Sequence, residues 1–188
     1  MLEEILAYNK RFVDSKEYQF FITDKYPNKQ VAVLTCMDTR LSTMLSAAMG
    51  LANGDAKIIK NAGALVSHPF GSTMRSLLVA VYDLNVTEIF VVGHDDCGAG
   101  SLNADTMMAK MTARGISQDT FMTLKGAGVN LRNWLAPFDN VEEAVQQTVA
   151  NIKGHPLMPT GVAVHGLVMK PDTGALRLIV RDPDATTD

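Results

Sequence analysis

VAVLTCMDTRL, residues 31–41, joins a run of apolar β-forming residues to a cluster of reactive side chains. The strand predicted at 31–35 is typical of one buried on both faces of a parallel sheet. Such a strand has no structural need for a thiol, a carboxylate and a guanidinium at its end. Cys36, Asp38 and Arg40 nevertheless follow it directly. We therefore expect the end of this strand to lie at the functional site.

Outside this stretch, strand-like and helix-like segments alternate along the chain. The apolar patterns predict further strands at 56–60, 88–93, 161–169 and 175–180, and the turn signal PDTG predicts a hairpin between the last two. Helices are predicted at 2–25 (one or two), 42–49, 72–84, 101–113 and 140–153, with short helices around Phe121 and 131–135. The alternation predicts an α/β fold: a mostly parallel central sheet of four strands with an antiparallel fifth edge strand, flanked by helices.

Length and composition restrict the class of protein. The 188 residues suit one domain, 1–188, with a helical arm at 1–25. A net charge of −3 argues against nucleic acid or a membrane surface as a partner. No apolar run approaches the ~20 residues of a membrane helix, and the acidic start MLEEILAYNK lacks the features of a signal peptide. We expect a cytoplasmic protein, in which a disulfide between the two cysteines is not favoured.

The strand at 88–93 also ends in ligand-type side chains, His94 and Cys97. Ligands collect at the carboxyl ends of neighbouring parallel strands, so these two side chains would meet Cys36 if the two strands are neighbours. Two thiolates and one imidazole, with one tetrahedral position left open, are typical of catalytic Zn²⁺. The simpler interpretation of each cysteine is a small buried apolar residue.

Asp38 and Arg40 lie on the same side of an extended segment as Cys36. A guanidinium is a permanent counter-charge, so Arg40 would hold Asp38 as a carboxylate. Asp38 would then accept a hydrogen bond from a zinc-bound water or hydroxide and orient it. Because two thiolates cancel the charge of Zn²⁺, Asp38 could also occupy the fourth position at lower pH. The alternative is an ion pair that only fixes the loop.

Three motifs in this order resemble the β-class carbonic anhydrases, in particular the compact prokaryotic branch. They are C-x-D-x-R at 36–40, N-A-G at 61–63 and G-H-x-x-C-G at 93–98. The resemblance implies that Cys36, His94 and Cys97 bind zinc and that Asp38 and Arg40 form a catalytic dyad. It implies reversible hydration of CO₂ to bicarbonate and a proton. It also implies a homodimer or homotetramer in which the N-terminal helices embrace a partner. Segment 114–139 has no evident counterpart in this pattern.

Other residues have candidate roles in that reaction. Backbone N–H groups of Gly63 and Ala64 are expected to position an oxygen of the substrate, since glycine permits close approach. Asp95, Asp96 and His68 are candidates for carrying the proton away. Both acids have a simpler interpretation as cap or solvent-facing residues.

Three alternatives stand beside this hypothesis. The same zinc site resembles that of hydrolases of carbon disulfide and carbonyl sulfide. A non-catalytic zinc or redox-sensing module would use the same ligands. A cysteine phosphatase or sulfurtransferase is disfavoured, because such enzymes usually place five residues between the cysteine and the arginine, whereas three separate Cys36 from Arg40.

Overall fold

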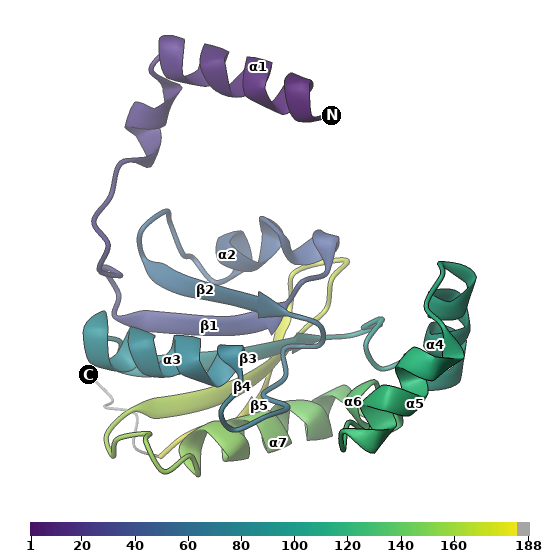
Figure 1. The fold of residues 1–188 in the computed structure, drawn as a ribbon. Helices are drawn as coiled ribbons and strands as arrows, with labels where there is room; N and C mark the ends of the chain where they lie inside the picture. Colours follow the sequence, from purple (N-terminus) through teal and green to yellow (C-terminus); the bar gives the residue numbers. More distant parts are fainter. Residues whose placement is uncertain (184–188) are drawn as a thin grey trace.

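The computed structural model describes residues 1–183, in which five strands form one sheet in the order β2-β1-β3-β4-β5 (Figure 1). Strands β1 to β4 are parallel, and β5 runs antiparallel to β4 at one edge. The predicted fold class is therefore confirmed. The strands are β1 (Val31–Cys36), β2 (Ala56–Asn61), β3 (Glu88–His94), β4 (Ala163–Met169) and β5 (Leu176–Val180).

Helices connect and flank the strands, with some boundaries that differ from the prediction. They are α1 (Leu2–Asp14), α2 (Met44–Ala48), α3 (Ser72–Asp83), α4 (Ala104–Ala113), α5 (Gln118–Gly126), α6 (Leu131–Trp134) and α7 (Val141–Lys153), with 3₁₀ turns η1 (Glu17–Phe21) and η2 (Thr39–Leu41). The helix predicted at 101–113 begins only at residue 104, because Asn103 caps it by accepting the Thr106 N–H. The predicted helix at 42–49 is shorter, because Asp38 first caps the turn η2.

The two faces of the sheet are covered by different helices. Ala32 and Leu34 of β1 pack with residues of α3 and α7, whereas Val31 and Val33 pack with Leu45 of α2 and its neighbours. All six residues of β1 are buried, as expected for a strand covered on both faces. Helix α2 follows β1 on one face and α7 precedes β4 on the other (Figure 1). In such sheets ligands collect at the carboxyl ends of the strands that flank the switch, which here are β1 and β3.

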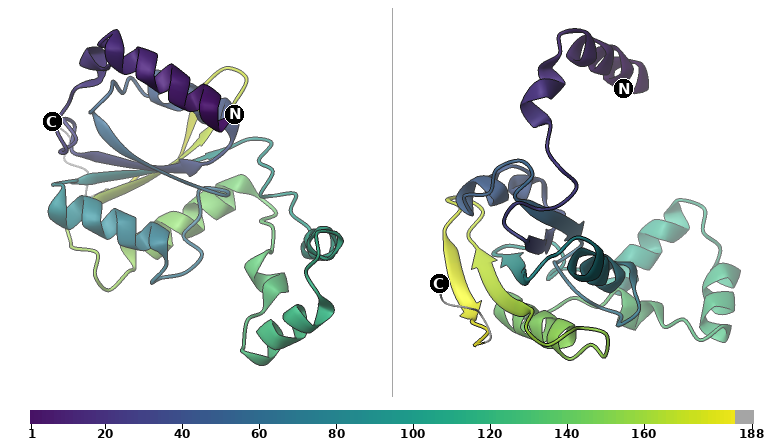
Figure 2. Two further views of the ribbon diagram at one scale, coloured as in Figure 1. Left: turned by 45° about the horizontal axis from the view of Figure 1, so that its top comes forward. Right: turned by 90° about the vertical axis from the view of Figure 1, so that its left-hand side faces the viewer.

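Two parts of the chain stand away from the sheet. Helix α1 and turn η1 contain no buried residue, and Figure 2 shows α1 separated from the body of the molecule. Helices α4, α5 and α6 also contain no fully buried residue among those described, and they project from a different side of the molecule than α1 does. Across residues 1–183, every helix is too short or too polar to cross a membrane.

Candidate metal centre

Three ligand-type side chains meet at the carboxyl ends of β1 and β3. Cys36 is the last residue of β1, His94 is the last residue of β3, and Cys97 lies in the loop that follows. The two strands are paired directly, with Thr35 beside Val92. The two sulfur atoms and a ring nitrogen all lie within 4.8 Å of one another. The structure thus brings together the three residues that the sequence singled out as ligands.

The distance between the two sulfur atoms suits a shared metal ion. Both cysteines are free, and their Sγ atoms are 3.7 Å apart. A disulfide would need about 2.05 Å. Two thiolates that each lie about 2.3 Å from one tetrahedral zinc ion would be about 3.8 Å apart. The spacing therefore fits a metal ion and not a disulfide.

The imidazole of His94 is oriented as a metal ligand would be. Its Nδ1 lies 2.9 Å from the backbone carbonyl oxygen of Asp95, so we assign the ring proton to Nδ1, which donates to that oxygen. Its Nε2 is buried and has no hydrogen-bond partner among the described residues. A buried nitrogen lone pair without a hydrogen-bond partner is unfavourable in a native structure. A metal ion at the cluster would satisfy it, so the donor set fits Zn²⁺.

A hydrogen bond joins the two cysteine sulfur atoms in the metal-free chain. The hydrogen bond with Cys97 lowers the pKa of Cys36, and the N–H of Gly63, 3.4 Å from Cys36 Sγ, lowers it further. The same bond raises the pKa of Cys97. Because thiolates and not thiols bind metals, a metal ion would displace any proton that the two cysteines carry.

The N-A-G motif shapes the loop that presents Gly63 to the sulfur. The Asn61 side chain accepts the Leu65 N–H at 3.0 Å and donates to the Leu65 carbonyl oxygen at 2.7 Å. These bonds close a loop in which Gly63 (φ +89°) and Ala64 (φ +59°) are both left-handed. The Gly63 N–H, which the sequence suggested for the substrate, is instead directed at Cys36 Sγ. A side chain at Gly63 would also place its Cβ 3.0 Å from the Cβ of Ala99.

Asp38 and Arg40 form a bidentate ion pair at the rim of the cluster. Arg40 Nε donates to Asp38 Oδ1 at 3.1 Å, and Nη2 donates to Oδ2 at 2.8 Å. The Arg40 backbone N–H adds a third bond to Oδ1 at 2.9 Å. These contacts lower the pKa of Asp38 to about 2. Asp38 Oδ2 lies 3.8 Å from His94 Nε2, so an ionised carboxylate oxygen lies beside the cluster.

The acids between the ligands, Asp95 and Asp96, are paired with arginines. Asp96 accepts from Arg40 Nη1 at 3.1 Å, and Asp95 accepts both Nη atoms of Arg177 at 2.9 and 3.0 Å. The pairing with Arg177 lowers the pKa of Asp95. The sequence interpretation missed Arg177. Two adjacent acids beside ligands indicate that counter-charges are needed, but not which arginines supply them. His68 is exposed, and its ring accepts the Phe70 N–H.

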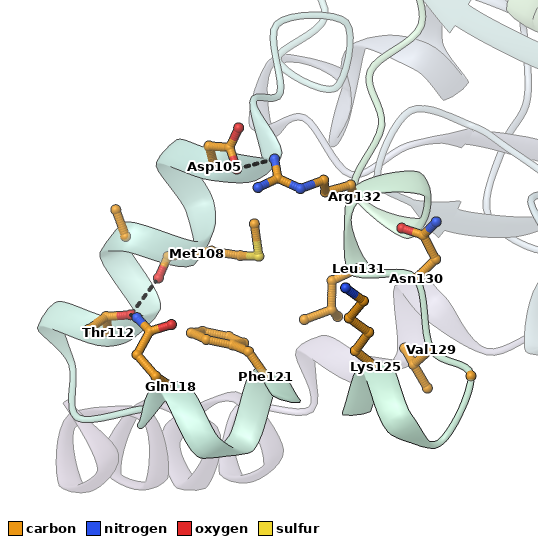
Figure 3. A pocket seen from close by; sticks show the side chains of 12 residues that line it. Asp105, Met108, Thr112, Gln118, Phe121, Lys125, Val129, Asn130, Leu131 and Arg132 are labelled. Atoms are coloured by element: carbon orange, nitrogen blue, oxygen red, sulfur yellow. Dashed lines mark hydrogen bonds and ion pairs between the residues drawn. The ribbon is translucent and has the colours of Figure 1, made fainter. Parts of the chain in front are cut away.

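A hollow of about 700 Å³ lies elsewhere, among α4, α5 and α6 (Figure 3). Phe121, Leu131 and Lys125 line it, and an ion pair between Asp105 and Arg132 closes one side. None of the three cluster residues lines this hollow. The hollow is therefore separate from the candidate metal centre, which is defined by the donor atoms of Cys36, His94 and Cys97.

Comparisons with known proteins agree with the chemistry of the cluster. The carbonic anhydrase family profile matches residues 31–176. YtiB of Bacillus subtilis (strain 168), provisionally named a carbonic anhydrase, is 52% identical over 180 residues, which cover 96% of each chain. A carbon disulfide hydrolase from Acidithiobacillus thiooxidans is 30% identical over 160 residues, which cover 80% of this chain and 77% of that protein.

Structural similarity extends over nearly the whole chain. The crystal structure of β-carbonic anhydrase isoform I from Trichomonas vaginalis matches with a TM-score of 0.87 and 32% sequence identity, covering 97% of this chain and 98% of that one. This coverage leaves little of the chain unmatched, so most of segment 114–139 has a counterpart there. The family that the three motifs indicated is confirmed: the chain belongs to the β-carbonic anhydrases.

Proposed function

We propose that this protein catalyses the reversible hydration of CO₂ to bicarbonate and a proton, with Zn²⁺ held by Cys36, His94 and Cys97. The observation that carries the proposal is the buried Nε2 of His94, which has no hydrogen-bond partner within residues 1–183 and lies beside two free thiols and an ionised carboxylate. When bound, Zn²⁺ lowers the pKa of a coordinated water and supplies a nucleophile near neutral pH.

Asp38 would orient the attacking water and would not remove its proton. A carboxylate whose pKa is about 2 is a poor base near pH 7, because an effective general base has a pKa near the working pH. The three donors of Arg40 leave the Asp38 oxygens able to accept one further hydrogen bond toward His94. In this proposal Asp38 Oδ2 accepts a hydrogen bond from the attacking water and so fixes which lone pair of that water faces the substrate carbon.

Gly63 and Ala64 would form the backbone side of the substrate site. The N–H of Gly63 is committed to Cys36 Sγ, so its contribution would be the absence of a side chain above the sulfur. Ala64 is almost fully buried and presents only a methyl group, which suits a small apolar substrate.

Hydrolysis of carbon disulfide or carbonyl sulfide is a second candidate activity for the same site. It is supported by the 30% identity to a carbon disulfide hydrolase over 80% of this chain. The three substrates share a linear shape with an electrophilic carbon, so the same nucleophile and the same orienting carboxylate would serve each of them.

Metal analysis joined to stopped-flow assays tests these proposals. The purified chain should contain one zinc ion per subunit and hydrate CO₂, with CS₂ and COS assayed in parallel under the same conditions. Faster turnover of CS₂ or COS than of CO₂ would favour the second activity. Stoichiometric zinc with no turnover of any of the three substrates at any pH would refute both and leave a non-catalytic zinc module.

We also propose that residues 1–25 form an arm that joins subunits into a homodimer or homotetramer. Helix α1 buries none of its residues, and the apolar side chains of Leu2, Phe20 and Ile22 are 66%, 87% and 73% exposed. Exposed apolar surface of this extent marks an interface. Light scattering should show an oligomer for the full chain and a smaller species after deletion of residues 1–25. A monomeric full chain would contradict the proposal.

A further inference from the structure

Asp95 and Asp96, the two acids that separate His94 from Cys97, are held from opposite sides of the loop 94–97, which we call the metal loop. Asp96 faces Arg40, which belongs to the segment after β1. Asp95 faces Arg177 of the edge strand β5. The first contact involves Arg40, which also pairs with Asp38 in the proposed dyad. The second reaches the site from a part of the chain that the proposed chemistry does not use.

Arg177 holds Asp95 through both guanidinium branches. Nη1 donates to Asp95 Oδ2 at 2.9 Å and Nη2 donates to Oδ1 at 3.0 Å, the paired geometry that makes arginine–carboxylate contacts directional. Nη2 also donates to Glu142 Oε1 at 3.2 Å, in the first turn of α7. The guanidinium is thus fixed between the metal loop and a helix that packs on the sheet.

The backbone of Asp95 transmits this position to the proposed ligand. Its N–H donates to the Met169 carbonyl oxygen at 3.0 Å, and its own carbonyl oxygen accepts the proton of His94 Nδ1 at 2.9 Å. Met169 ends β4, and its neighbour Val168 is the register partner of Arg177 on β5. Asp95 is therefore held to the β4–β5 hairpin by both its backbone and its side chain, while its carbonyl sets the orientation of the imidazole.

We propose that Arg177 is a positioning residue for metal binding: it holds Asp95 so that the Asp95 carbonyl directs His94 Nε2 at the metal ion. This inference rests on the proposed zinc site. Contacts that orient a metal-bound histidine typically change metal affinity by 10- to 100-fold when they are removed. Arg177 is 46% exposed, and the bond from the Asp95 N–H to the Met169 carbonyl oxygen also restrains Asp95, so the lower end of that range applies. Arg177→Met should weaken Zn²⁺ binding about tenfold.

Zn²⁺ affinity of the full-length protein, measured by competition with a chromophoric chelator, tests the inference. Arg177→Lys keeps the charge but not the paired geometry, so it should recover only part of the loss. Arg132→Met is the matched control: it removes an exposed arginine paired with Asp105 on α4, away from the cluster, and should leave affinity unchanged.

A double variant separates positioning from general stability. If Arg177 acts through Asp95, adding Arg177→Met to Asp95→Asn should weaken Zn²⁺ binding less than it does in the wild-type background. The urea midpoints of the metal-free variants should stay close to that of the wild type, whereas their Zn²⁺ affinities should fall. If Arg177 only stabilised the fold, its substitution would lower those midpoints, and the losses of Zn²⁺-binding free energy from the two substitutions would simply add in the double variant.

Unchanged Zn²⁺ affinity in Arg177→Met, an equal loss in Arg132→Met, or strict additivity in the double variant would each overturn the inference. The readout does not involve catalysis. A wild-type protein that binds zinc in an Arg177-dependent way but turns over no substrate would therefore refute the proposed function alone. A wild-type protein that binds no zinc would overturn both.

Discussion

Asp38→Asn is the substitution that most directly tests the proposed role of the dyad. It changes one oxygen to an amide nitrogen with almost no change of shape. Oδ1 accepts two hydrogen bonds from Arg40 and Oδ2 accepts one, so the asparagine oxygen should take the Oδ1 position. The amide nitrogen then takes the Oδ2 position, 3.8 Å from His94 Nε2 in the native chain. A donor replaces the acceptor at the point that faces the cluster.

The size of the effect follows from the bond that is lost. A hydrogen bond to a charged acceptor contributes about 1.5–3 kcal/mol. If this bond is made fully only in the transition state, its loss lowers the rate of hydration by roughly 10- to 150-fold, at about 1.36 kcal/mol for each factor of ten. Zinc content should stay at the wild-type level, because Asp38 is not among the three clustered donors.

Stopped-flow CO₂ hydration and elemental analysis of the same preparations measure the two expectations. Asp172→Asn, the same charge change on an exposed turn outside the site, is the matched control and should leave both readouts unchanged. Wild-type turnover in Asp38→Asn with full zinc occupancy would refute the orienting role. Loss of zinc in that variant would instead indicate that Asp38 takes part in holding the metal.

Three further perturbations have defined outcomes. Cys97→Ser should lose the metal by elemental analysis and lower the thermal midpoint, since metal binding and folding are coupled; full zinc content would contradict the ligand assignment. Gly93→Ala should cost about 1–3 kcal/mol in urea denaturation, because its Cβ would lie 2.8 Å from Val145 Cγ2; an unchanged midpoint would mean that α7 shifts freely. Arg40 lowers the pKa of Asp38 from 3.8 to about 2, so the pair stabilises the metal-free fold above about pH 4, and this contribution is lost as the pH falls toward 2. The stability difference between wild type and Asp38→Asn, from urea midpoints, should therefore be smaller at pH 3 than at pH 5; a larger difference at pH 3 would contradict the assignment.

The strands and the convergence of the three ligand-type residues were predictable because local patterns determine them. The buried run before Cys36 and the run before His94 both indicate parallel strands, and parallel strands end at the same edge of a sheet. The short helices within 114–139 were harder to predict, because α5 and α6 contain no buried residue among those described and so carry a weak periodic pattern.

The partners of Asp95 and Asp96 could not be predicted because they depend on backbone conformation and distant pairing. Asp96 is left-handed at φ +53°, which turns the loop so that consecutive side chains face opposite ways. Arg177 and Arg40 then reach them from segments 82 and 56 positions away in the chain. A sequence pattern records neither the turn nor the edge strand that supplies Arg177.

These arginines also address a difficulty in the chemistry of a zinc ion held by two thiolates. Two thiolates cancel the charge of Zn²⁺, so any further negative charge nearby weakens the acidification of a bound water. Asp38, Asp95 and Asp96 would bring three such charges to the cluster if they were unpaired. Arg40 lies against Asp38 and Asp96, and Arg177 lies against Asp95, so each carboxylate has a cation within about 3 Å. The acids would therefore fix the metal loop by hydrogen bonding, while the two guanidinium groups offset part of their charge where the proposed nucleophile forms.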